Sequence, residues 1–196
     1  MISDTKERIL ITALKMFSEK GYEGTNLREL LAELGFTKAA FYKHYESKEE
    51  LWNAVIDEMR AYYEDHFGSI RNMPTIPQST DELSKLTLKM LNITMYDEKI
   101  VMTRKLLLTE QFHDNRICAL ATEHFNEGLE SMFTIIFDGM MKNGSLKKND
   151  PAMLAFVFTS PISSLIQLCD REPKRNKAIM RKIKTFTEHF ISVYGA

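Results

Sequence analysis

The sequence predicts an all-α protein with short helices in its N-terminal part and longer helices in its C-terminal part. Two observations support this prediction. Apolar residues recur at spacings of three and four along most of the chain, which is the period of an amphipathic helix. Several of these runs follow a serine, threonine, aspartate or asparagine that can cap a helix. Only residues 68–80, with Pro74 and Pro77, have the composition of a long loop.

The composition is that of an ordinary soluble globular protein. Of the 196 residues, 44% are apolar and 27% are charged, with a net charge of −1, which excludes a disordered chain. No run approaches the roughly 20 apolar residues of a membrane helix, and the N-terminus has no signal-peptide core. Cys118 and Cys169 are far apart and outside any CxxC motif, which argues against a disulfide framework or a zinc site. We expect a cytoplasmic protein without membrane contact.

The first helix is predicted to begin at Asp4 and to stop at Gly21. Asp4 can cap it, with Glu7 three residues later, and glycine is a common residue where a helix ends. Its apolar stripe should face inward and support the helices that follow. This stripe consists of Ile9, Ala13, Met16 and Phe17.

A second, short helix is predicted from Asn26 to Leu34. Asn26 can cap it, and Glu29 can reach back to complete a capping box. Gly35 follows at the point where a residue in the left-handed conformation would end the helix. Four leucines give the helix an apolar stripe, namely Leu27, Leu30, Leu31 and Leu34.

A third helix is predicted from Lys38 to Tyr45, directly after a cap at Thr37. Phe41 and Tyr45 are four residues apart, so both should lie on the inward face. The opposite face should carry small, cationic and hydroxyl-bearing side chains, which suit the groove of a nucleic acid duplex. These side chains are Lys38, Ala39, Tyr42 and Lys43.

A fourth helix is predicted to begin after Ser47 and to run toward Phe67. Ser47 and Glu50 form another capping-box pattern, and Lys48 lies in the first turn. A lysine beside the unsatisfied backbone N–H groups of a helix start is a suitable site for a phosphate. Because this helix leads from the N-terminal part toward the C-terminal part, we expect it to transmit movements between them.

A helix-turn-helix alone is a weak signal, because any two packed helices with solvated charges give the same pattern. The ordered set of residues in the first third of the chain is a more specific signal. The relevant residues are Ile9, Leu10, Ala13, Phe17, Gly21, Tyr22, Thr25, Asn26, Gly35, Phe36, Thr37, Lys38, Tyr42, Tyr45 and residues 47–51. Together they resemble the N-terminal domain of the TetR family of bacterial transcriptional regulators. The resemblance implies an all-helical, homodimeric, ligand-responsive protein that binds a double-stranded DNA operator, usually as a repressor.

The resemblance also indicates which residues contact DNA. Residues 38–40, 43 and 44 should reach base edges, whereas Thr25, Tyr42 and Lys48 should reach phosphates, and Arg28 can serve at either. Ala39 and Ala40 stand where the family often has glycine and threonine, which favours apolar contact with a thymine methyl group. The complete predicted interface is Thr25, Asn26, Arg28, Thr37, Lys38, Ala39, Ala40, Tyr42, Lys43, His44 and Lys48.

Five further helices are predicted in the C-terminal part. They begin after Ser79, after a turn near Asp97, at Ala119, at Pro151 and at Asn176. The helix that starts at Pro151 is apolar nearly all round, so it must be covered on several sides. A homodimer interface formed by the last two helices, as the resemblance implies, would cover it. An intrachain core would account for the same residues.

An effector site is predicted among the apolar side chains of the C-terminal part. Methionine and phenylalanine side chains line adaptable apolar cavities, although most of those here serve equally well as core residues. Gln111 or His113 would add polarity for a small apolar ligand. The expected lining is Met102, Leu106, Gln111, Phe112, His113, Phe133 and Phe137.

No catalytic or cofactor motif is present. The chain lacks an HExxH sequence, a glycine-rich phosphate loop and a G-x-S-x-G elbow, so we expect neither an enzyme nor a cofactor. Glu110 and His113 form one E-x-x-H pair, but a di-iron bundle needs two such pairs and further glutamates. We therefore predict no metal site.

The predicted domains are a helix-turn-helix DNA-binding domain (1–46), a connecting helix (47–67) and a helical effector-binding and dimerisation domain (68–196). The function indicated is a dimeric repressor released from a palindromic operator by a small apolar ligand. The alternative is a helical small-molecule carrier or metal-binding bundle in which the N-terminal helices are only structural.

Overall fold

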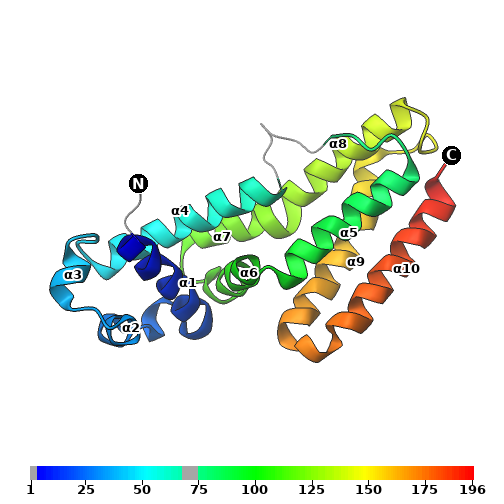
Figure 1. The fold of residues 1–196 in the computed structure, drawn as a ribbon. Coiled ribbons are helices and arrows are strands. Elements are labelled where there is room, and N and C mark those ends of the chain that lie inside the picture. Colours follow the sequence, from blue (N-terminus) through cyan, green and yellow to red (C-terminus); the bar gives the residue numbers. More distant parts are fainter. Residues whose placement is uncertain (1–3, 68–74) are drawn as a thin grey trace. The chain divides into compact units, whose positions relative to one another are not determined.

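The computed structural model describes residues 4–67 and 75–196, which are helical almost throughout (Figure 1). Within these ranges there is no β-strand, only an isolated bridge between Leu146 and Gly195. The all-α prediction is therefore confirmed. The α-helices are α1 (Asp4–Gly24), α2 (Leu27–Leu34), α3 (Lys38–Tyr42), α4 (Lys48–Phe67), α5 (Thr80–Tyr96), α6 (Glu98–Glu110), α7 (Asn115–Thr122), α8 (Gly128–Lys142), α9 (Pro151–Arg171) and α10 (Asn176–Tyr194), with a π-helical turn η1 (Glu123–Glu127) and a 3-10 turn η2 (Pro173–Arg175).

The chain divides into two compact units, each built from two separate segments. The first unit contains residues 1–64 and 98–120, and the second contains residues 65–97 and 121–196. α6 and most of α7 therefore pack with the N-terminal helices, although they follow the predicted boundary at residue 68. Sequence periodicity locates a helix but does not reveal which neighbours it packs against. The functional domains proposed above stay a prediction.

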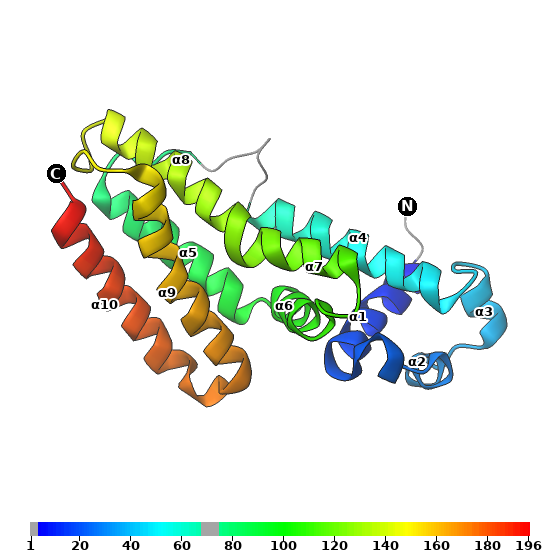
Figure 2. The same cartoon turned by 180° about the vertical axis from the view of Figure 1, so that it is seen from behind.

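In the first unit, α1 packs against α2 and α6 (Figures 1 and 2). The helical backbone of α1 is broken at Gly21, which has φ 72° and ψ 174°, so the predicted stop at this glycine is confirmed. The core of this unit, to which α3 and α4 also contribute, is apolar, and its burial stabilises the unit. Its largest members include Ile9, Leu14, Phe17, Leu30, Phe41, Tyr45, Leu51 and Met59.

The third helix is shorter than predicted. α3 spans Lys38–Tyr42, and the chain then leaves the helix in a turn. The N–H groups of His44 and Tyr45 both donate to the carbonyl of Phe41, at 2.8 and 3.1 Å. This turn keeps Tyr45 on the inward side even though it lies beyond the helix.

In the second unit, α9 packs along α8 and also against α10, to which η2 joins it (Figure 1). Aromatic rings from these three helices form the centre of the core, with neighbouring ring centroids 4.7–6.5 Å apart. The rings belong to Phe133, Phe137, Phe158, Phe186 and Phe190.

α9 contradicts the expectation that no segment is apolar enough for a membrane. Pro151–Arg171 is long and apolar enough to cross one, with a mean hydropathy of 1.7 over 18 residues. However, the core helix of a globular protein passes the same test. α9 packs against α8, α10 and α5, with Leu154, Ala155 and Phe158 buried. Length and hydropathy alone therefore do not distinguish a membrane helix from a core helix here.

Candidate nucleic-acid interface

α3 has one buried face and one exposed face, as the sequence predicts. Phe41 and the following Tyr45 are 0% and 2% exposed, and their ring centroids lie 5.8 Å apart. Tyr42, in contrast, is 55% exposed. Lys38, Ala39 and Lys43 are also exposed, whereas Ala40 and His44 are half-buried. No described residue therefore covers the outer face of α3, which is accessible to a duplex.

The turn between α2 and α3 fixes the direction of α3. Gly35 adopts the left-handed conformation, with φ 67° and ψ 27°, and its N–H donates to the carbonyl of Ala32. The hydroxyl of Thr37 then caps α3 by accepting from the N–H of Ala40 at 3.2 Å. Both features agree with the sequence prediction.

The start of α2 differs from the predicted capping box. Asn26 is the cap, and its side chain accepts from the N–H of Arg28 at 2.8 Å. Glu29 does not reach back to it, because its carboxylate accepts from Lys20 Nζ at 2.7 Å. A hydrogen bond between two charged groups is stronger than one to a neutral backbone N–H. The Glu29 carboxylate therefore binds a lysine of α1, which the local sequence pattern does not reveal.

The lysines of α1 and those beside α3 differ in their ion pairs. Lys15 and Lys20 on α1 form ion pairs with glutamates of α2, at 3.1 and 2.7 Å. Lys38 and Lys43 form no ion pair within the described residues. Two lysines without a carboxylate partner in the described chain thus lie at the start of α3 and directly after its end, which suits contact with a polyanion.

The remaining predicted DNA contacts lie beside α3 and differ in exposure. Arg28 and Asn26 are exposed at the start of α2, and Lys48 is half-buried at the start of α4. Thr25 is only 3% exposed, and its hydroxyl donates to the carbonyl of Gly21 at 2.8 Å. In this conformation the Thr25 hydroxyl is not available to a phosphate.

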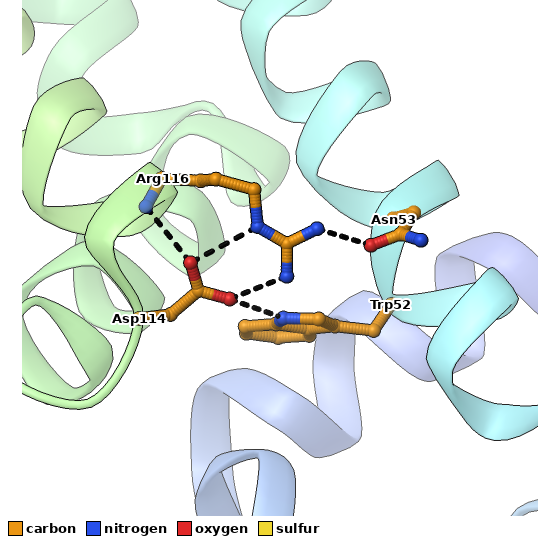
Figure 3. A network of polar contacts seen from close by, with 4 residues as sticks. All are labelled: Trp52, Asn53, Asp114 and Arg116. Carbon is orange, nitrogen blue, oxygen red and sulfur yellow. Dashed lines mark hydrogen bonds and ion pairs between the residues drawn. The ribbon is translucent and has the colours of Figure 1, made fainter.

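A polar network joins α4 to the turn between α6 and α7 (Figure 3). The indole Nε1–H of Trp52 donates to Asp114 Oδ2 at 2.9 Å. Arg116 donates to the same carboxylate from Nε at 3.0 Å and Nη2 at 2.6 Å, and to Asn53 Oδ1 from Nη1. These hydrogen bonds hold the pKa of the Asp114 carboxyl well below its usual range, and the side-chain bond from Arg116 has the largest effect.

A cleft of about 740 Å³ opens beside this network in the first unit. It is lined by residues from the end of α1, the start of α4 and the α6–α7 turn, including Tyr22, Trp52, Glu110, Phe112, Asp114 and Arg116. The sequence pattern does not predict this cleft. Asp114 could have been recognised as a helix cap before α7, but no local pattern links it to Trp52, which is 62 positions away.

The predicted effector residues are divided between the two units. Met102, Leu106, Gln111, Phe112 and His113 lie in the first unit, and Phe133 and Phe137 lie in the second. Phe112 is 85% exposed, and Phe112 and His113 line the cleft of the first unit described above. Phe133 and Phe137 belong to the ring core of the second unit. The effector pocket itself stays a prediction.

The single E-x-x-H pair is not assembled into a metal site. Glu110 Oε1 accepts from the backbone N–H of Tyr22 at 3.3 Å, and His113 is exposed. Across residues 4–67 and 75–196, no group of three or more His, Cys, Asp or Glu side chains could hold a metal ion.

The N-terminal region matches a known family of proteins. Residues 9–55 match the family model described as bacterial regulatory proteins, tetR family. Over 167 residues, which are 68% of this chain and 89% of its relative, the chain is 26% identical to IcaR of Staphylococcus epidermidis, the negative transcriptional regulator of the biofilm operon icaADBC. It is 36% identical to the HTH-type transcriptional regulator YuxN of Bacillus subtilis over 103 residues, which are 51% of this chain and 34% of YuxN.

The fold is also shared with solved structures. SmeT, the repressor of the Stenotrophomonas maltophilia multidrug efflux pump SmeDEF, superposes with a TM-score of 0.69 at 17% identity. The superposition covers 99% of this chain and 92% of SmeT. At this level of identity the likeness establishes the fold alone.

Proposed function

This chain belongs to the TetR family of bacterial regulatory proteins, and on that premise we propose that it is a dimeric repressor released from a palindromic operator by a small apolar ligand. It is a DNA-binding transcriptional regulator and not an enzyme. The repressor role is supported by its similarity to IcaR, a negative regulator. The protein acts on DNA, so we place it in the cytoplasm and assign it no membrane contact.

The main structural support for this proposal is the outer face of α3. Lys38 and Lys43 have no carboxylate partner within the described chain, and Tyr42 between them is 55% exposed. The burial of Phe41 on the other face holds α3 rigidly on its neighbours. A short rigid helix with small and cationic outer side chains fits the major groove, where lysines contact guanine and alanines contact thymine methyl groups.

The last two helices are the proposed dimer interface. α9 exposes Met153, Phe156 and Val157, which are 56%, 52% and 38% exposed, and α10 exposes Val193 at 43%. Large apolar side chains that are exposed at helical spacing favour a partner surface. A second copy would cover them and would present two α3 helices to one operator, as a two-fold symmetric protein requires.

A selection from random duplexes tests this function. The purified full chain is expected to enrich a partly palindromic site whose half-sites are about one helical turn or slightly more apart. Binding to the enriched duplex should weaken steeply with salt, with a slope of about −0.9 for each phosphate contacted. Failure to enrich any duplex at low salt would contradict the proposal.

A further inference from the structure

Lys48, the proposed phosphate contact at the start of α4, lies over an aromatic ring. Its Nζ is 4.2 Å from the centroid of the Tyr22 ring. Such a cation–π contact restricts where the ammonium group can lie and leaves its N–H donors on the far side able to bind an oxygen. Lys48 is half-buried, which restricts it further. The position of this ammonium group therefore depends on the position of Tyr22.

The Tyr22 ring is held by its neighbours within the first unit. Its centroid lies 5.1 Å from that of Trp52 and 5.9 Å from that of Phe17. The backbone is also fixed, because the N–H of Tyr22 donates to Glu110 Oε1 and the preceding Gly21 has a positive φ. The ring consequently has little freedom to turn away from Lys48.

Trp52 is in turn held by the turn between α6 and α7. Its Nε1–H donates to Asp114, and Arg116 fixes that carboxylate with two further side-chain bonds (Figure 3). Its ring also makes an edge contact with Phe17, with centroids 5.0 Å apart. A continuous series of contacts thus connects the α6–α7 turn to the start of α4.

We propose that Tyr22, Trp52 and Asp114 form an aromatic relay that positions the Lys48 ammonium group for an operator phosphate. The relay rests on the proposed function, because it assigns these three side chains to the DNA contact of that function. Tyr22 and Trp52 are positioning residues, since they act through Lys48 rather than on the duplex. The α6–α7 turn then sets the strength of one phosphate contact in each subunit.

A double-mutant cycle on operator affinity tests the relay. Lys48→Ala is expected to weaken binding by about tenfold in the wild-type background. It should also reduce the salt slope by about two units in the dimer, because one phosphate in each half-site no longer has an ammonium partner. In a Tyr22→Leu background the same change should weaken binding by less than about threefold, because the ammonium group is no longer held.

Tyr22→Phe is the matched control, because it keeps the ring face and removes only the hydroxyl. It should retain the affinity and salt slope of the wild type. Asp114→Ala removes no aromatic ring but frees the Trp52 indole from its hydrogen bond. It should therefore reproduce part of the Tyr22→Leu effect, so the test does not depend on one variant being folded. Circular dichroism of each variant verifies its helical content.

Trp52 provides a direct signal, since it is the single tryptophan of the chain. Operator binding should change its fluorescence emission, and this change should be absent in Lys48→Ala. If Lys48→Ala weakens binding equally in wild-type and Tyr22→Leu proteins, the relay is refuted while operator binding stands. If no duplex is bound by the wild type, the proposed function fails and the relay fails with it.

Discussion

At the scale of single residues, Tyr45 shows how one side chain serves the interface from the inside. The ring is 2% exposed and packs on Phe41, but the buried hydroxyl oxygen has no hydrogen-bond partner among residues 4–67 and 75–196. Burial, and secondarily the charges of Glu50 and Glu58, raises the pKa of Tyr45 to about 12. The ring is thus useful to the fold, whereas the hydroxyl group costs free energy.

Tyr45→Phe is therefore expected to leave the unfolding free energy at pH 7 unchanged or to increase it by up to about 1 kcal/mol. The Tyr45 pKa is higher in the folded state than its value of about 10 in the unfolded chain. Because the folded state disfavours the ionised form, this group leaves the unfolding free energy constant below about pH 10 and lowers it as the pH rises toward 12. Denaturant unfolding at pH 7 and about pH 11 measures both effects. A variant that is clearly less stable at pH 7 would show that the hydroxyl has a partner.

At the scale of elements, Gly21 governs how α1 meets the rest of the first unit. Its φ of 72° with ψ of 174° belongs to a region that is almost restricted to glycine. A Cβ there would also lie 2.5 Å from Glu110 Oε1, the acceptor for the Tyr22 N–H. The carboxylate could move aside only by weakening that bond.

Gly21→Ala should therefore destabilise the protein by about 1–3 kcal/mol, mostly through backbone strain. Gly35→Ala is the matched control, because Gly35 also has a positive φ but lies in the milder left-handed helical region with open space around it. We expect a smaller destabilisation, of about 1 kcal/mol, for that variant. The midpoints of thermal unfolding rank the two, and a Gly21→Ala protein as stable as the Gly35→Ala protein would be inconsistent with this role.

Some features of the helices could be predicted from the sequence and others could not. Caps at Asn26 and Thr37, the stop at Gly35 and the inward face of α3 follow from residues close in sequence, and the structure agrees with each. The capping box at Glu29 failed because Lys20, on another helix, binds that carboxylate. Interactions of this kind depend on how helices pack, which periodicity does not specify.

The candidate site likewise has a part that could be predicted from the sequence and a part that could not. The exposed residues of α3 are local and could be predicted, because a helix period assigns each residue to a face. The network between Trp52 and Asp114 joins positions 62 residues apart, and these meet only because the α6–α7 turn lies against α4. Without that packing, Asp114 is only a helix cap and Trp52 only a core residue.

At the scale of the whole molecule, the proposed recognition of an operator requires two copies of the chain. The exposed apolar side chains of α9 include Phe156, near the middle of the stripe. Phe156→Glu would place a charge in the proposed interface, where burying it without a partner is unfavourable. Sedimentation velocity should find a monomer for this variant at concentrations where the wild type is a dimer.

Ile135→Glu provides the matched control for the dimer. Ile135 is 46% exposed, but it lies on α8, outside the last two helices. This variant should remain dimeric. A dimer that persists in Phe156→Glu would place the interface elsewhere.

The operator affinity of Lys43→Ala is the most direct test of the claim that the outer face of α3 reads DNA. The measurement compares fluorescence anisotropy titrations of the selected duplex with the wild type, Lys43→Ala and the control Lys105→Ala, an exposed lysine of α6. Removing a base contact costs about 1–3 kcal/mol, so Lys43→Ala should bind at least about fivefold more weakly, while Lys105→Ala should match the wild type. Equal affinity of all three proteins for the duplex would contradict the account.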